Sequence, residues 1–244
     1  MPADGKISQS ACAKLTPKLL GQAENVREGF LFLFFKDTED LCRPCNQSST
    51  PPEALVETLS ILSILISRFP QQLSSENLSS PPLVVLAPLL SHPRPVVRKR
   101  AIVTLSQFIP ISPPGLFEDL LKSHVLPHLA ANANLDKQRT TVQLIASVAK
   151  HSPAQIAGSL GEIVLPIVKA AQREDDELRE GCLQALEVLL LRCPSEITPY
   201  LSSIIQVGNQ FIKYDPVRYR FWFELIVTYC GYNLFFSTTE LRRR

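Results

Sequence analysis

The sequence contains little glycine, 9 of its 244 residues, although it contains 20 prolines. The scarcity of glycine argues against glycine-rich phosphate loops, arrays of β-hairpins and collagen-like repeats, and the prolines indicate many element boundaries. The sequence also lacks a large excess of charge, since its formal net charge is +2, so we expect no nucleic-acid partner. No apolar run reaches the roughly 18 residues that a membrane-spanning helix needs, so we expect no membrane association.

Signals of export are also missing. Residues Met1–Ser10 are polar and do not contain the apolar core of a signal peptide. Without such a signal, six cysteines in a chain of this length do not indicate a disulfide framework. We therefore expect a reducing compartment, cytoplasmic and/or nuclear. A folded protein is expected because apolar residues make up 45% and charged residues 20% of the chain.

Aromatic residues are concentrated in two stretches of an otherwise aliphatic chain. Of the 18, four lie within 26–47 and eight within 217–244. Both stretches begin with Val-Arg, which a splice-donor sequence can encode, and the first ends in a glutamine, whose codon can close an acceptor site. One hypothesis is that both stretches are translated introns. The alternative is a genuine insertion loop and a genuine terminal helix.

An internal repeat organises the middle of the chain. Three segments superimpose without gaps: VVRKRAIVTLSQF (96–108), KQRTTVQLIASVA (137–149) and ELREGCLQALEVL (177–189). Apolar residues in these segments recur in steps of four, four and three, which places them on one stripe of an α-helix. The stripe residues are Val97, Ala101, Leu105 and Phe108, then Val142, Ala146 and Ala149, then Leu178, Cys182, Leu186 and Leu189. An earlier helix is expected over 54–68, with Leu55, Leu59, Leu62 and Ile66 on one face.

A second helix is expected before each of these helices. The segments are 83–90, 116–130, 159–171 and 198–212, and 14–20 is similar to them. Three of them contain a proline, Pro88, Pro127 and Pro166, at intervals of 39 residues, which predicts a recurrent kink. A helix pair with a period of about 40 residues is typical of HEAT and armadillo repeats.

The predicted fold class is therefore all-α, an α-solenoid of about 4–5 HEAT-type helical hairpins, with one irregular insertion and an atypical C-terminal tail. The expected organisation is a partial first repeat (1–25), an atypical insertion or linker (26–53), the HEAT-repeat solenoid (54–216) and a basic, aromatic tail (217–244).

Motifs for catalysis or metal binding are weak. The pair Cys42 and Cys45 forms a C-x-x-C, but neither the strand context of a thioredoxin nor a second ligand pair is present. His124 and His128 lie about 80 residues further on and are expected on one polar helix face. The chain has no G-x-S-x-G and no H-E-x-x-H. We expect no enzymatic activity, no cofactor and no metal.

Basic residues open the helix expected over 96–108, and the repeat continues them. The candidate partner-binding residues are Arg94, Arg98, Lys99, Arg100, Arg139 and Arg179. One interpretation is a groove that holds an acidic partner surface. The alternative is a structural ladder between repeats, with Asp136 and Asp175 as possible partners of the arginines. Nuclear localisation through RPVVRKR is a third possibility.

An acidic run predicts a helix start. Four acidic residues, 174–177, come just before or in the first turn of a helix, where carboxylates are favourable because they face the positive end of the helix dipole.

The order of three segments indicates a family. SHPRPVVRKRAIVTL, EDDELREGCLQALEVLLLRCPSEITPY and FIKYDP resemble the N-terminal HEAT repeats of the cullin-associated, neddylation-dissociated protein family, over roughly 50–216 and more weakly over 10–25. Members of that family are much longer, so the chain resembles a fragment.

The resemblance implies a non-enzymatic scaffold. Such proteins wrap around cullins that lack the ubiquitin-like modifier and exchange substrate receptors of cullin–RING (SCF-type) ubiquitin ligases. The resemblance further implies contacts with the cullin and the RING subunit, without the exchange activity of the C-terminal repeats. From the repeats alone, an importin-like adaptor, a phosphatase-type scaffold and a truncated, non-functional product remain open.

Overall fold

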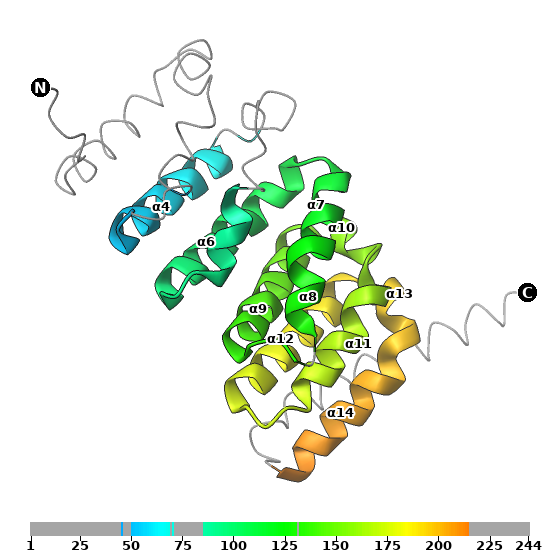
Figure 1. Cartoon of the computed structure of the whole chain (residues 1–244). Helices are drawn as coiled ribbons and strands as arrows, with labels where there is room; N and C mark the ends of the chain where they lie inside the picture. The colour runs from blue at the N-terminus through cyan, green and yellow to red at the C-terminus, as the bar shows by residue number, and fades with distance from the viewer. Residues whose placement is uncertain (1–44, 46–49, 69, 71–84, 131, 215–244) are drawn as a thin grey trace, which may run out of the picture. The chain divides into compact units, whose positions relative to one another are not determined.

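The computed structural model describes residues 45, 50–68, 70, 85–130 and 132–214 (Figure 1). Every regular element in this part of the chain is helical, and none of these residues lies in a strand. The chain divides into two compact units, Met1–Val125 and Leu126–Arg244. The all-α class predicted from the repeat is confirmed.

The first unit contains two neighbouring helices joined to shorter turns. Its elements are α4 (Pro52–Arg68), η2 (Ala87–Ser91), α6 (Pro95–Phe108), η3 (Ile109–Ile111), α7 (Pro114–Leu120) and η4 (Leu121–Val125). α4 packs against α6, and η2 folds back on α6 to form a short hairpin. The unit therefore places the helix expected over 96–108 between an earlier helix and its own preceding turn.

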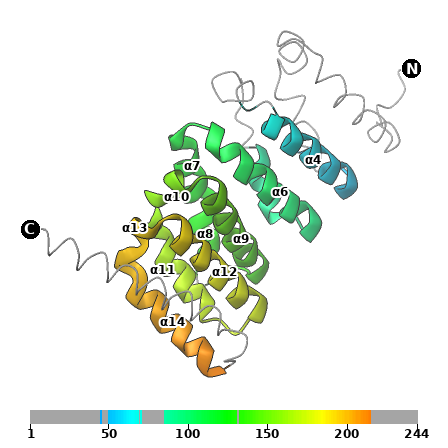
Figure 2. The ribbon, with the colours of Figure 1, turned by 180° about the vertical axis from the view of Figure 1, so that it is seen from behind.

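The second unit is a two-layer stack of helices. Its elements are α8 (Leu126–Leu129), α9 (Leu135–His151), α10 (Pro153–Ala157), α11 (Leu160–Ala171), α12 (Asp176–Arg192), α13 (Pro194–Ile197), η5 (Thr198–Tyr200) and α14 (Leu201–Tyr214). One layer contains α8, α11 and α14, in that order of contact, and the other contains α9 and α12. Figures 1 and 2 show the two layers from opposite sides. Consecutive hairpins stacked in this way form the helical-repeat arrangement of a solenoid.

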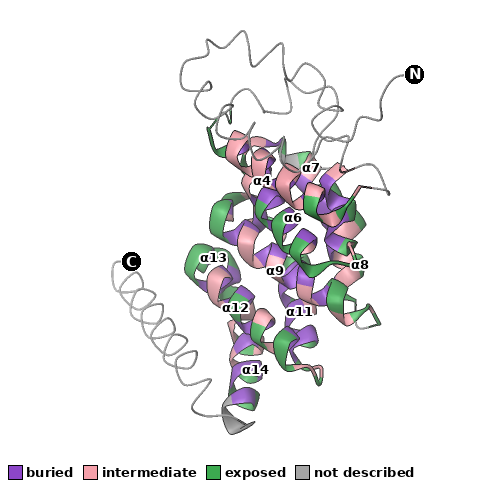
Figure 3. Ribbon diagram, turned by 90° about the vertical axis from the view of Figure 1, so that its left-hand side faces the viewer, coloured by how far each residue is buried: buried purple, intermediate pink, exposed green. Residues whose placement is uncertain are grey.

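The predicted apolar stripes form the core of these units. All residues of the four stripes are buried except Ala146, which is half-buried. Figure 3 shows buried residues recurring along the helices, with half-buried and exposed residues between them. Because an isolated helix exposes this stripe to water, the helices are stabilised by the neighbour that covers it.

The three spaced prolines do not have one common structural effect. Pro166 lies inside α11, whereas Pro127 is the second residue of α8, directly after the π-helical segment η4. The segment 83–90 differs from the prediction, because its described part is α-helical only at Val85 and Leu86 and then tightens into the 3₁₀ turn η2, which contains Pro88. A proline cannot donate an i→i−4 hydrogen bond, and a 3₁₀ turn after a short helical start accommodates that loss.

Several sequence predictions fall on residues outside the described part. They are the partial repeat 1–25, most of the insertion 26–53, and the tail 217–244. The domain boundaries at these segments, and both interpretations of the aromatic stretches, stay predictions.

Candidate functional site

The basic residues at the start of α6 surround a helix end that has no side-chain cap. Arg94 is the N-cap residue, with φ −83° and ψ 120°, and its side chain makes no capping hydrogen bond. Pro95 follows at the first helical position, where its fixed φ is favourable and its missing N–H costs nothing. Arg94, Lys99 and Arg100 are exposed, and Arg98 is half-buried.

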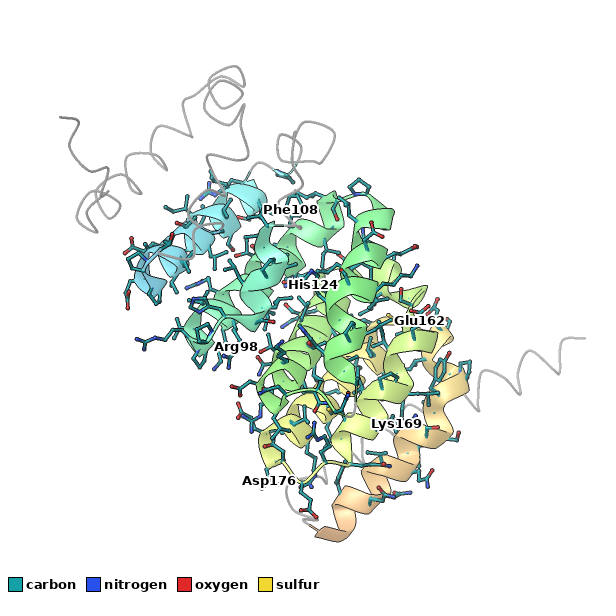
Figure 4. All side chains as sticks on the ribbon, in the orientation of Figure 1. Arg98, Phe108, His124, Glu162, Lys169 and Asp176 are labelled. Carbon is teal, nitrogen blue, oxygen red and sulfur yellow. The ribbon has the colours of Figure 1, made fainter. Side chains whose placement is uncertain are left out.

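Arg98 is held by the turn that precedes α6. Its Nη1 donates to the carbonyl oxygens of His92 at 2.9 Å and Pro93 at 3.1 Å. The backbone N–H of Arg94 donates to Nδ1 of His92 at 3.1 Å, so the same turn is fixed from two sides. Arg98 lies at the end of α6 opposite Phe108 (Figure 4). Its guanidinium therefore shapes the turn.

Arg139 bridges two repeats in the second unit. Its Nε and Nη2 donate to the two carboxylate oxygens of Asp175 at 3.1 and 2.5 Å. Its Nη1 lies 3.0 Å from Glu177 and 3.5 Å from Asp136. The structural ladder that the sequence offered as an alternative is confirmed for Arg139, which joins α9 to the start of α12.

Asp175 has a second role as the N-cap of α12. Its Oδ1 accepts the backbone N–H of Leu178 at 2.7 Å. The hydrogen bonds from Arg139, and then that from Leu178, hold the pKa of Asp175 below its ordinary value. One carboxylate therefore satisfies both a helix end and an arginine of the preceding repeat.

Arg173 makes the reciprocal connection. It lies in the turn between α11 and α12, and its Nη1 donates to the carbonyl oxygen of Ala133 at 3.1 Å and to Oε1 of Gln138 at 2.5 Å. Gln138 is fully buried, and its Nε2 donates to the carbonyl oxygen of Ala130 at 2.7 Å. The sequence does not predict this pair, because a basic residue in a turn and a glutamine in a helix form no distinctive pattern.

Arg179 makes both a hydrogen bond to a backbone carbonyl, as Arg98 does, and an ion pair, as Arg139 does. Its Nη2 donates to the carbonyl oxygen of Arg173 at 3.2 Å, six residues earlier, as Arg98 does to His92. Its Nη1 pairs with Asp176 at 2.7 Å, and its guanidinium lies 5.0 Å from the ring centre of Phe211 on α14. Arg98, Arg139 and Arg179 thus occupy equivalent helix positions, and each donates hydrogen bonds to other residues of the chain.

Reactive groups are scattered through the described residues. Cys182 is fully buried, and burial raises the pKa of its thiol to about 12. His124 is half-buried in η4, and His128 lies in α8. Within the described part, no three histidine, cysteine, aspartate or glutamate side chains group as a metal site would require. None of the helices described is both long and apolar enough to cross a membrane.

Comparison of sequences gives similarity to the cullin-associated NEDD8-dissociated proteins. No protein-family model matches the chain. The cullin-associated NEDD8-dissociated protein 1 of Drosophila melanogaster is 35% identical over 161 residues, and the cullin-associated NEDD8-dissociated protein 2 of Mus musculus is 35% identical over 163, each covering 66% of the chain. The cullin-associated NEDD8-dissociated protein 1 of Dictyostelium discoideum is 28% identical over 223 residues, which cover 88% of the chain. The chain spans 13 to 16% of the length of these relatives. The resemblance seen in the three sequence segments is confirmed as a similarity to part of such a protein.

Proposed function

From its similarity to part of the cullin-associated NEDD8-dissociated proteins, we propose that the chain is a non-enzymatic scaffold that binds a cullin–RING complex lacking the NEDD8 modifier. The observation that carries the proposal is 35% identity over 161 and 163 residues to two relatives whose names state association with cullin. The match covers only a small share of those relatives, so we expect binding without the exchange of substrate receptors.

The repeat architecture supports a binding role. The helices bury their apolar stripes against their neighbours, and α6, α11 and α12 also carry exposed residues along their length. Stacked hairpins of this kind offer a surface to a large partner. In the second unit, Arg139 and Asp175 join one hairpin to the next, and Arg173 and Gln138 join them again in the other direction. These contacts fix the relative position of neighbouring hairpins, which preorganises the surface for binding.

The test is capture by a purified, immobilised cullin–RING complex, prepared with and without NEDD8. We expect the full chain to be retained on the unmodified complex and retained less on the modified one. A small GTPase of nuclear transport, loaded with GTP, serves as the rival probe, because an importin-like adaptor would bind it. Recovery on the GTPase alone, or equal recovery on both cullin preparations, would contradict the proposal.

Two substitutions in α9 test whether the contact between repeats matters for binding. Arg139→Ala is the test variant, and Lys150→Ala is its control. Arg139→Ala removes the bridge to Asp175 but changes only one partly exposed side chain, and Lys150→Ala removes an exposed cation from the same helix. We expect Arg139→Ala to weaken capture and Lys150→Ala to leave it unchanged. Equal capture of both variants would argue that the spacing of hairpins does not matter for binding.

A further inference from the structure

We propose that the exposed side of α6 is a docking surface for an acidic protein segment that also carries apolar side chains. The surface, here the α6 face, consists of Arg94, Val96, Lys99, Arg100 and Val103. The inference rests on the proposed function, since it specifies the chemistry of a protein that a scaffold of this kind would bind.

The spacing along the helix places these residues on one side. Val96, Lys99, Arg100 and Val103 recur in steps of three, one and three, which brings them onto adjacent rows of α6. Val96 is 62% exposed and Val103 is 38% exposed. They are two of the four large apolar side chains that are exposed in the described residues, so half of that exposed apolar set lies on one helix, among cations.

The opposite side of α6 explains why the face remains outside the core. Val97, Ala101, Leu105 and Phe108 are buried, and α6 packs against α4 and η2. Ile102, Thr104 and Ser106 are buried as well, so the buried residues form one continuous arc of the helix and the α6 face lies on the remaining arc. The apolar area at Val96 and Val103 is not used by the described packing of the first unit.

Charge on the α6 face is not explained by folding. Arg94, the N-cap residue, lies at the positive end of the helix dipole, which is unfavourable for a cation, and α6 has no acidic residue in its first turn. The sequence has no aspartate or glutamate from 77 to 117. Arg94, Lys99 and Arg100 form no ion pair with any other described residue. A carboxylate supplied by a partner would relieve the repulsion.

α12, one of the two helices of the second unit that align with α6, shows the alternative arrangement. α12 begins with Asp176 and Glu177 and is capped by Asp175. Arg139 and Arg179 are paired with these carboxylates. At that helix the chain supplies its own counter-charge, whereas Arg94, Lys99 and Arg100 of the α6 face have no carboxylate partner among the described residues. An external acidic group would supply that partner.

The interleaved valines favour a protein over a nucleic acid. Single-stranded nucleic acids are bound by cations together with aromatic side chains on which bases stack, and the α6 face contains no aromatic residue. Valines between cations instead suit a segment in which acidic and apolar residues alternate. A small net charge of +2 also provides little long-range attraction for a polyanion.

The probe is a short fluorescein-labelled peptide of glutamate and leucine, titrated with the full chain by fluorescence anisotropy. We expect saturable binding that the triple variant Arg94→Glu/Lys99→Glu/Arg100→Glu weakens at least about tenfold. The variant Val96→Ser/Val103→Ser should weaken it about threefold. The matched control, Lys137→Glu/Lys150→Glu/Lys169→Glu, makes the same change of net charge at exposed lysines of α9 and α11, and we expect unchanged affinity.

Each of the following binding results would overturn the inference. They are equal binding by the triple variant, equal weakening by the control, equal binding of a glutamate–serine peptide, and tighter binding of single-stranded DNA at the same residues. Far-UV circular dichroism and the neutral variant Arg94→Gln/Lys99→Gln/Arg100→Gln show that any loss does not arise from unfolding. Sedimentation checks that the cations do not hold two copies of the chain together, which would also overturn it.

Cullin–RING capture by the same variants separates this inference from the proposed function. If the triple variant is captured as well as the unaltered chain, the α6 face is not the docking site, although the proposed function stands. If the unaltered chain binds the peptide through α6 but is not captured by any cullin–RING complex, the proposed function fails and the α6 face stands as an acidic-peptide surface.

Discussion

Replacement of Asp175 tests how neighbouring repeats are joined. Asp175→Ala removes both the cap of α12 and the carboxylate that Arg139 contacts. Asp175→Asn keeps a capping oxygen but removes the charge and the second oxygen that accepts from Arg139. Loss of an N-cap costs about 1 kcal/mol. The side chains of Asp175 and Arg139 are 14% and 26% exposed. The ion pair is therefore partly buried, and we expect it to contribute about 1 kcal/mol to the unfolding free energy.

The expected losses in unfolding free energy are therefore about 2 kcal/mol for Asp175→Ala and about 1 kcal/mol for Asp175→Asn. Urea unfolding followed by circular dichroism measures both. A double-mutant cycle of Asp175→Asn with Arg139→Ala should give a coupling of about 1 kcal/mol. The control Asp136→Asn removes a longer, more exposed contact of the same arginine and should cost at most about 0.5 kcal/mol. A coupling near zero between Arg139 and Asp175 would refute the bridge.

The same pair predicts a dependence on pH. The pKa of Asp175 lies below its ordinary value of 3.8 in the folded chain, mainly because Arg139 donates to the carboxylate. Folding therefore favours the ionised form, and this contribution is present above the ordinary pKa and is lost as the pH falls through the folded value. The difference in unfolding free energy between the unaltered chain and Asp175→Asn should be constant above about pH 5 and shrink below about pH 4. An increasing difference at low pH would contradict the assignment.

Three further predictions concern the core, its cysteine and the contact between Arg179 and Phe211. Leu105→Ala should lower the unfolding free energy by about 2–5 kcal/mol, because Leu105 is fully buried, whereas Val103→Ala, at an exposed position of the same helix, should change it by under about 0.5 kcal/mol in urea unfolding. Burial raises the pKa of the Cys182 thiol to about 12, so Cys182 should resist iodoacetamide in the folded chain and react with it in urea. Peptide mass mapping measures the labelling, and rapid labelling without urea would contradict the burial of this thiol. Phe211→Leu should cost about 0.5–1 kcal/mol beyond the change in packing, and this excess should vanish in an Arg179→Ala background if the ring and guanidinium interact.

The repeat made much of the fold predictable. Apolar residues in steps of four, four and three lie on one face of a helix, and that face is the one that packs against a neighbour. The four stripe residues of α12, from Leu178 to Leu189, are accordingly all buried. The acidic run 174–177 likewise predicted a helix start, and Asp175 caps α12. Local spacing and end chemistry therefore carried this part of the prediction.

Contacts between repeats were harder to predict. Arg98, Arg139 and Arg179 align in sequence, yet Arg98 bonds to backbone carbonyls and Arg139 to a carboxylate of the next hairpin. The bond from Arg173 to Gln138 spans 35 residues and depends on how two turns approach each other. The 3₁₀ turn at Pro88 depends on where the preceding helix begins, which the proline interval of 39 residues does not specify.

Hydrogen–deuterium exchange of the full chain, with and without an unmodified cullin–RING complex, tests the central claim most directly. We expect the complex to protect amides in the helical repeats, with the largest change in the first turns of α6, and to protect them less when it carries NEDD8. A folded, helical chain whose exchange is the same with and without the complex would contradict the claim that these repeats form a cullin-binding surface.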